Sequence, residues 1–315
     1  MAQLNPPWEH TDQGVVLPDH AAHRVLVTFT YPIALPANSS TALFRVDLRT
    51  GAADPVPIDP DGEVAWATGL ATSGDRVFVL YCVNREFRVS VLSLESLELL
   101  SSHRLPEVRD GHSLLHHDGA LLVVSSGTDE VLAYDDRPEG LVPRGAVWRA
   151  SAEGRDTHHL NSLARHGNSV LVSGFGPRAS KLWASAENGY VRDITRDEVV
   201  VKDVYHPHTV SVHDGELYWC ESHHARVVSR SGRTAGTDGY PRGLGWLAPQ
   251  LACVGTSQGR KVSKSTGQVA NPSDPGMPRG RCGLTIADLA AGRTLGFIDL
   301  GALGPEIYDV LPLPS

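Results

Sequence analysis

Three histidines precede similar short stretches of the chain, and their type and spacing suggest metal chemistry. His112 and His208 each lie six residues before the aspartate of an Asp-Gly pair, and His159 stands in a looser copy of the same pattern. Neutral imidazoles are common ligands of divalent transition metals. The recurrence therefore predicts that a histidine occupies one equivalent structural position in three repeats.

Each histidine opens an alternation of apolar and polar residues that ends at a turn. The pairs Asp118-Gly119 and Asp214-Gly215 favour the positive φ angles of a two-residue hairpin, and a second apolar strand follows each pair. A strand that opens a repeat is predicted in this way near residues 69, 112, 159, 208, 242 and 306.

The spacing of these opening strands is typical of repeated four-stranded sheets. The chain ends on an opening strand at 306–313 with nothing after it, whereas residues 23–58 supply outer strands that lack an opening strand. A closed ring in which both termini share the last sheet leaves no long free edge. We therefore predict a six-bladed β-propeller with four-stranded blades over residues 23–315, preceded by an N-terminal extension at 1–22. Two β-sandwiches would not explain the complementary ends.

Composition limits the partners and the compartment. The net charge is −8 and no basic run is interleaved with aromatic residues, which argues against a nucleic-acid partner. The first residues lack a secretory signal, and no apolar run is long enough to span a membrane. Four cysteines without a CxxC pair fit a reduced, cytoplasmic protein.

Several segments resemble an uncharacterised bacterial β-propeller family. That family carries a His-x-Asn-Gly-Leu-Ala type motif, a Pro-His segment before a His-Asp-Gly turn, an Arg-Gly-Leu segment before a Val-Gly strand, and a final Glu-Ile-Phe-Asp-Val. The matching segments here are 158–164, 207–215, 242–244, 254–257 and 306–310, with Ser162 in place of glycine and Tyr308 in place of phenylalanine. The resemblance implies the propeller fold and the register of its repeats, but it implies no activity.

In a propeller the innermost strands surround the axis, so their first residues meet at one mouth of the channel. This places five residues around the mouth: His112, His159, His208, Arg242 and Glu306. We predict that the imidazoles of His112, His159 and His208, together with Glu306, bind a divalent metal ion such as Fe, Cu, Mn or Zn. Asn161 could add an oxygen ligand or hold a water.

The spacing also suggests residues that could orient the metal ligands, and it leaves open an explanation without a metal. Asp110 and Asp156 each lie shortly before a channel histidine and could orient its ring. Alternatively, the histidines are only hydrogen-bonding residues, and Arg242 and Glu306 form an ion pair across the axis.

The predicted function is that of a metal-dependent enzyme acting on a small molecule at the channel mouth. Glu306 would act as a ligand or general base, Arg242 would hold an anionic group of the substrate, and the loop at 256–282 would close over the site. The nitrogen-rich site favours an oxidoreductase. The alternatives are a metal-dependent hydrolase or lyase, or a binding scaffold without catalysis, and metal analysis would discriminate between them.

Overall fold

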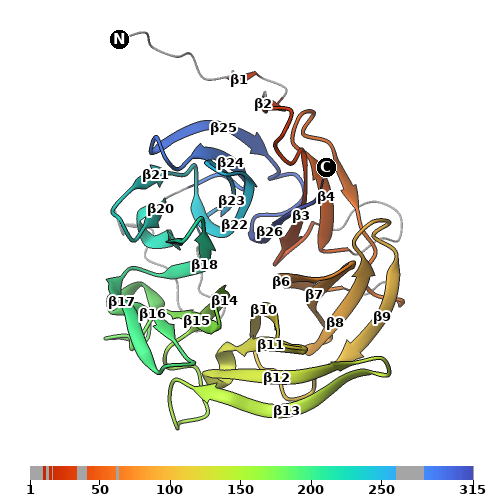
Figure 1. Cartoon of the computed structure of the whole chain (residues 1–315), viewed down its shortest axis with the longest axis vertical. Helices are drawn as coiled ribbons and strands as arrows, with labels where there is room; N and C mark the ends of the chain where they lie inside the picture. The colour runs from red at the N-terminus through yellow and green to blue at the C-terminus, as the bar shows by residue number, and fades with distance from the viewer. Residues whose placement is uncertain are drawn as a thin grey trace.

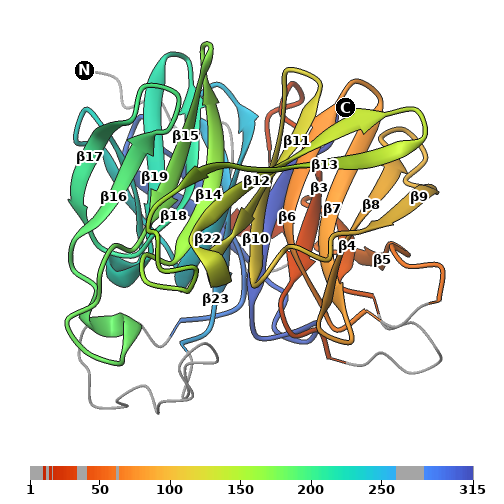
Figure 2. The same cartoon turned by 90° about the horizontal axis from the view of Figure 1, so that it is seen from below.

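Six antiparallel sheets of four strands surround one axis in the computed structural model (Figure 1). The structure describes residues 10–11, 14–15, 17–33, 41–61, 64–259 and 280–314. The sheets stand side by side in a ring, seen from below in Figure 2. This arrangement is the six-bladed β-propeller that the sequence predicts.

For each blade, the bounds of its four strands are given in order from the innermost to the outermost. They are β26 (Ile307–Pro312), β3 (Arg24–Phe29), β4 (Leu43–Asp47), β5 (Ala53–Pro55); β6 (Trp66–Ser73), β7 (Arg76–Val83), β8 (Glu86–Ser93), β9 (Leu99–Arg104); β10 (Gly111–His117), β11 (Ala120–Ser125), β12 (Glu130–Arg137), β13 (Gly140–Arg149); β14 (Leu160–His166), β15 (Ser169–Gly174), β16 (Gly189–Asp193), β17 (Glu198–Val204); β18 (Pro207–His213), β19 (Glu216–Glu221), β20 (Arg226–Ser229), β21 (Thr234–Gly236); and β22 (Tyr240–Ala248), β23 (Leu251–Ser257), β24 (Gly283–Asp288), β25 (Arg293–Asp299). Three short 3₁₀ turns are η1 (Ser126–Thr128), η2 (Trp183–Ser185) and η3 (Ser222–His224).

The tight turns confirm the hairpins read from the sequence. Asp118 and Gly119 have φ angles of 48° and 73°, and Asp214 and Gly215 have φ angles of 49° and 76°. Two consecutive positive φ values match the right-handed twist of the flanking strands, which is why Asp-Gly is favoured there. Each turn joins an innermost strand to the second strand of its blade.

Burial along the strands follows their distance from the axis. Nearly every residue of β7 is buried, because neighbouring blades cover both faces of a second strand. In β13, the outermost strand of the next blade, half of the residues are exposed and none is buried. The core therefore lies between adjacent blades rather than within one sheet.

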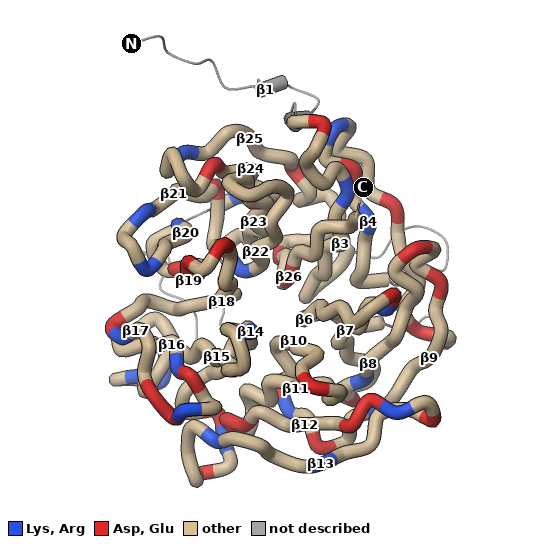
Figure 3. Tube along the Cα trace, viewed as in Figure 1, with Lys and Arg blue, Asp and Glu red and all other residues tan. Residues whose placement is uncertain are grey.

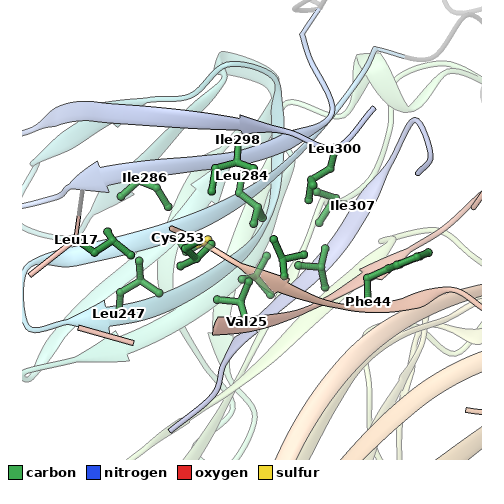
Figure 4. Close-up of a cluster of buried hydrophobic side chains, with 14 of the residues drawn as sticks. Leu17, Val25, Phe44, Leu247, Cys253, Leu284, Ile286, Ile298, Leu300 and Ile307 are labelled. Carbon is green, nitrogen blue, oxygen red and sulfur yellow. The ribbon is translucent and has the colours of Figure 1, made fainter. Parts of the chain in front are cut away.

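The two ends of the chain close the ring. β26 pairs antiparallel with β3, so that Ile307 lies opposite Phe29 and Val310 lies opposite Val27. Figure 4 shows the buried cluster that joins this blade to the one before it, with Cys253 among the labelled residues. Burying a large aliphatic side chain in such a cluster stabilises the fold by roughly 1.5–3 kcal/mol. The predicted closure is confirmed.

Adjacent innermost strands contact one another all the way around the ring, including β26 with both β22 and β6. Hydroxyl groups add hydrogen bonds across these contacts. Thr28 Oγ1 donates to the carbonyl of Thr68 at 2.6 Å, and Thr68 Oγ1 donates to the carbonyl of Gly111 at 3.0 Å. The Thr68 bond joins the innermost strands β6 and β10, whereas the Thr28 bond joins β3, the second strand of its blade, to β6.

The chain before the ring is described only in part. β1 (His10–Thr11) pairs with β2 (Gly14–Val15), and Leu17 and Ala21 are buried in the cluster of Figure 4. The division into an extension at 1–22 and one propeller domain at 23–315 stays a prediction.

Candidate functional site

A β-bulge interrupts all six innermost strands at the same height. The pairing with the second strand shifts there by one residue in every blade. A bulge re-aims side chains and is common beside functional sites. The first bulged residues form what we call the inner ring, which consists of Thr68, His112, Asn161, His208, Arg242 and Tyr308.

Two residues before each bulge lies a second set, which we call the outer ring. Its members are Trp66, Asp110, His159, His206, Tyr240 and Glu306. Three of them, Asp110, His159 and His206, have φ angles of 50°, 48° and 51°. Each of these three accepts a hydrogen bond from the first residue after the second strand of its blade, at 3.1, 3.3 and 3.2 Å. The shared φ angle and hydrogen bond show that these positions are equivalent.

This register corrects the position expected for His159. The sequence predicts that His112, His159 and His208 are equivalent, but the structure places Asn161 at the position of His112 and His208. The reason is that the turn after β14 falls at 167–168, so the residue six positions before it is Asn161. Glu306 is likewise in the outer ring, and Tyr308 takes its expected place in the inner ring.

Among the described residues, one group of side chains could hold a metal ion: Asp110, His112 and His159. Their ligand atoms all lie within 4.8 Å of one another. The rings of His112 and His159 meet edge to face, with centroids 4.9 Å apart. Bonds of roughly 2.1 Å place two ligands of one ion no more than about 4.2 Å apart, so binding would draw these side chains slightly together.

The histidines of this cluster are oriented by acceptors on Nδ1. The Nδ1 of His112 lies 2.8 Å from the carbonyl oxygen of Asp110, and the Nδ1 of His159 lies 3.1 Å from Oδ2 of Asp156. Since a carbonyl only accepts, Nδ1 of His112 carries the proton and Nε2 presents a lone pair. Asp156 therefore has the orienting role expected for it, whereas Asp110 orients His112 through its backbone.

Burial and neighbouring charges keep His112 and Asp156 in the protonation states that favour a bound cation. Burial lowers the pKa of His112 to about 4, since the charge of Asp110 compensates only in part and His159 adds to the shift. Burial alone would raise the pKa of Asp156, but His159, His112 and Arg178 together lower it below its ordinary value. A neutral imidazole and an ionised carboxylate are the forms that bind metals.

His208 lies outside the cluster, but hydrogen-bond acceptors hold its Nδ1 as they do in His112 and His159. Its Nδ1 lies 2.8 Å from Ser222 Oγ and 3.3 Å from the carbonyl oxygen of His206. Ser222 Oγ itself donates to the carbonyl of Pro241, so it accepts from His208. Burial and the charge of Arg242 hold the pKa of His208 well below its usual range. Nε2 of His208 is thus also a lone-pair donor at neutral pH.

Glu306 and Arg242 form the ion pair considered as the simpler explanation. Glu306 is also outside the metal cluster; it accepts a hydrogen bond from Thr30 at 2.8 Å, and its Oε2 lies 3.7 Å from Arg242 Nη1. The guanidinium carbon of Arg242 lies 5.4 Å and 5.5 Å from the ring centroids of Tyr240 and Tyr308. The two aromatic faces and the carboxylate fix the cation at the mouth.

Two buried polar atoms of the inner ring have no hydrogen-bond partner within the described chain. Asn161 donates from Nδ2 to the carbonyl of His159 at 2.7 Å, but its Oδ1 has no donor. The Nε of Arg242 has no acceptor. Asn161 is 1% exposed and the Arg242 side chain is 11% exposed. Unsatisfied buried groups are rare, and at a channel mouth they indicate a ligand or ordered water.

An aromatic wall beside the cluster was not anticipated from the sequence. The ring of Trp183 lies 4.6 Å from that of His159, and Phe175 stacks on His206 at 4.3 Å with an interplanar angle of 10°. His206 Nε2 donates to the carbonyl of Trp183 at 2.9 Å and Nδ1 accepts from Tyr240 at 3.1 Å. Figure 2 shows the connection from β15 to β16, which carries Trp183, projecting from one face of the ring. The sequence feature that could have identified His206 is its spacing of two residues from His208.

The loop expected at 256–282 connects β23 with β24. Its lid role concerns residues 260–279, which lie outside the described residues. The described start of the connection passes the site, because Gln258 N–H donates to the carbonyl of Pro305 at 2.9 Å, next to Glu306.

Acidic and basic residues are both spread around the ring. In Figure 3 every blade carries both signs. In the portion that the structure describes, no helix has the length and apolar character needed to cross a membrane.

The fold and this mouth define a six-bladed propeller with a candidate metal centre on its axis. The chain belongs to the family described as "Domain of unknown function (DUF4915)", whose model matches residues 146–315, more than half of the sequence. The resemblance to an uncharacterised propeller family is thereby confirmed, while its specific motif stays a prediction. A comparison with curated proteins found no match.

Solved structures share the fold at low sequence identity. A chain of the nidogen/laminin complex is 9% identical with a TM-score of 0.60, over 93% of this chain and 98% of that one. A functionally unknown protein from Desulfotomaculum acetoxidans is 12% identical with a TM-score of 0.51, over 95% and 93%. A protein from Lactobacillus plantarum is 13% identical with a TM-score of 0.50, over 92% and 98%. These likenesses concern the fold alone.

Proposed function

We propose that this protein is a metal-dependent enzyme that acts on a small molecule at the mouth of the propeller channel. The observation that carries the proposal is the cluster of Asp110, His112 and His159, with ligand atoms within 4.8 Å of one another. Three protein ligands leave open positions on an ion for substrate or water. A divalent ion held there would supply Lewis-acid or redox chemistry.

The donor set favours redox chemistry. Two histidines and one carboxylate with open positions are the ligands of non-haem iron(II) oxygenases, whereas zinc with similar ligands supports hydrolysis. We therefore propose an oxidoreductase. Zinc or manganese in the purified protein would instead support a hydrolase or lyase.

Arg242 and Glu306 complete the proposed site. Arg242 is the fixed cation of the inner ring and would bind an anionic group of the substrate. Glu306 is 4% exposed and is held by Thr30, so its carboxylate has a defined position beside Arg242. In this proposal Glu306 orients the guanidinium and acts as the general base.

Metal analysis of protein purified without a histidine tag tests the proposal. We expect about one ion per chain in the wild type, and at least a tenfold weaker affinity in His112→Ala, His159→Ala and Asp110→Asn, since even groups that only orient ligands are worth about 10–100-fold. His166→Ala is the matched control, because His166 is exposed at the far end of β14. His208→Ala reports whether His208 is a further ligand, as the sequence predicts.

Two outcomes would contradict the metal site. One is wild-type protein that stays metal-free after incubation with Fe(II), Mn(II), Zn(II) and Cu(II). The other is a metal content that falls equally in His112→Ala and in the His166→Ala control. Melting curves of each variant separate a lost ligand from a lost fold.

A further inference from the structure

We propose that the inner ring binds a carboxylate that carries vicinal hydroxyl groups, of which glycerate is the smallest example. The inference rests on the proposed function, because it names the substrate class of the same mouth. It starts from Asn161, His208 and Arg242, which lie at equivalent bulge positions of three consecutive innermost strands, β14, β18 and β22.

Hydrogen bonds hold these three strands side by side at this height. The N–H of Val210 donates to Ser162 Oγ at 2.9 Å, and Thr209 Oγ1 donates to the carbonyl of Arg242. Ser162 and Thr209 directly follow Asn161 and His208 in the chain. His208 therefore lies between the strand that carries Asn161 and the strand that carries Arg242.

The polar atoms along this arc have a definite order. Asn161 Oδ1 is a buried acceptor and Arg242 Nε is a buried donor, both without a partner in the described chain. His208 lies between them, and its Nδ1 contacts leave Nε2 as an acceptor. The complementary ligand presents two donors and one acceptor, which two hydroxyl groups and a carboxylate supply.

The acceptor is assigned as a carboxylate rather than a phosphate on grounds of charge. Arg242 is the one cation of the inner ring, and Glu306 lies 3.7 Å from its Nη1. The Arg242–Glu306 pair is already neutral, so a phosphate dianion would place two further negative charges beside Glu306 and a carboxylate only one. The hydroxyl at Asn161 would lie beside the metal cluster, because Asn161 is bonded to His159.

Calorimetric titration of the full-length protein with four probes tests the inference without any variant. The probes are glycerate, lactate, propionate and glycerol, which differ in hydroxyl groups and charge. Each neutral hydrogen bond is worth about threefold to tenfold in affinity and the charged one at least about tenfold. We expect affinity to fall from glycerate to lactate to propionate, and glycerol to bind more weakly than glycerate by at least that charged factor.

Variants then assign the contacts. Arg242→Gln should weaken all three acids by at least about tenfold. Asn161→Ala should weaken glycerate by about threefold to tenfold and leave propionate unchanged. Arg165→Gln and Asn168→Ala are matched controls, because both residues are exposed at the opposite end of the β14 hairpin, and they should bind as the wild type does.

The inference is overturned if propionate binds as tightly as glycerate, if inorganic phosphate binds more tightly than glycerate, or if Arg242→Gln leaves glycerate affinity unchanged. Metal content measured on the same samples keeps the two proposals apart. If metal-loaded protein binds none of the four probes, the proposed ligand class is contradicted and the metal site is still supported. Protein that stays metal-free after incubation with the four ions but still ranks the probes as expected supports the ligand class and contradicts the metal proposal.

Discussion

The histidines of the mouth differ in which ring nitrogen carries the proton. His112 and His208 donate from Nδ1, which leaves Nε2 of each ring as a lone-pair donor. His206 uses both nitrogens within the protein, with Nε2 bonded to the carbonyl of Trp183 and Nδ1 bonded to Tyr240. His206 is therefore a positioning residue that holds the aromatic wall, and it is not available to a ligand.

The buried His206 makes stability depend on pH. Burial lowers its pKa to about 3, and the neighbouring His223, His159 and His224 add to the shift. Because the folded pKa is depressed, its contribution is complete above about pH 6.5 and is lost as pH falls toward 3. At pH 5 the loss is about 2 kcal/mol, at about 1.4 kcal/mol per pH unit below 6.5. Other groups, including Asp309, also titrate in this window, so the test is a difference: between pH 7.5 and pH 5 the unfolding free energy of His206→Gln should change by about 2 kcal/mol less unfavourably than that of the wild type, measured by urea unfolding.

The exposed His166 provides the comparison for that experiment. His166→Gln should keep the wild-type pH dependence of the free energy of unfolding. An identical dependence in His206→Gln would show that His206 is protonated in the folded protein.

At the scale of elements, hydrogen bonds join neighbouring innermost strands at the bulge. In three blades the residue after the inner-ring residue accepts a hydrogen bond from a backbone N–H of the next innermost strand. The acceptors are Ser113, Ser162 and Asp309, at 3.3, 2.9 and 2.9 Å. Asp309 thus holds with a carboxylate the position that serine holds elsewhere. Burial raises its pKa to about 7, despite the backbone N–H groups of Leu70 and Val310 that bond to it.

Asp309→Asn should remove from the stability profile a component that falls as pH rises from about 4 to about 7. A raised folded pKa means that the contribution of Asp309 is complete below about pH 3.9 and is lost as pH rises through about 7. The wild type should therefore lose unfolding free energy from this residue over that window, whereas the amide cannot titrate. Chemical denaturation at pH 5 and pH 8 measures the difference, with Asp118→Asn in an exposed turn as the control. Equal slopes for Asp309→Asn and the wild type would mean that Asp309 is ionised throughout.

At the scale of the whole molecule, ring closure rests on one strand from the C-terminus. β26 pairs with β3 and contacts the innermost strands of both adjacent blades, and Ile307 and Val310 lie in the core cluster. Its removal would expose the backbone groups of β3 and the apolar faces of two neighbours.

Truncation after Leu303 should therefore yield insoluble or partly unfolded protein. Truncation after Leu313 keeps β26 and should melt as the full chain does. Circular dichroism melts and the soluble fraction compare the two. A protein ending at Leu303 that melts like the full chain would show that β26 is dispensable for closure.

The sequence alone determined the architecture of this protein. Six opening strands, Asp-Gly turns and complementary ends predict a closed six-bladed ring, because hairpins depend on neighbouring residues and on period-2 burial. It also identified most residues that line the mouth, including His112, His208 and Arg242. Such information is local, so it can be read without knowing which strands meet.

Only the tertiary structure decided how these residues are grouped. The bulges place His159 and Glu306 in the outer ring, and the packing of neighbouring blades brings Asp110 into the metal cluster. Trp183 reaches the site from the connection between β15 and β16 through its bond to His206. A bulge is defined by the strand it pairs with, and the contacts of the mouth join different blades, so neither is encoded in the spacing along one strand.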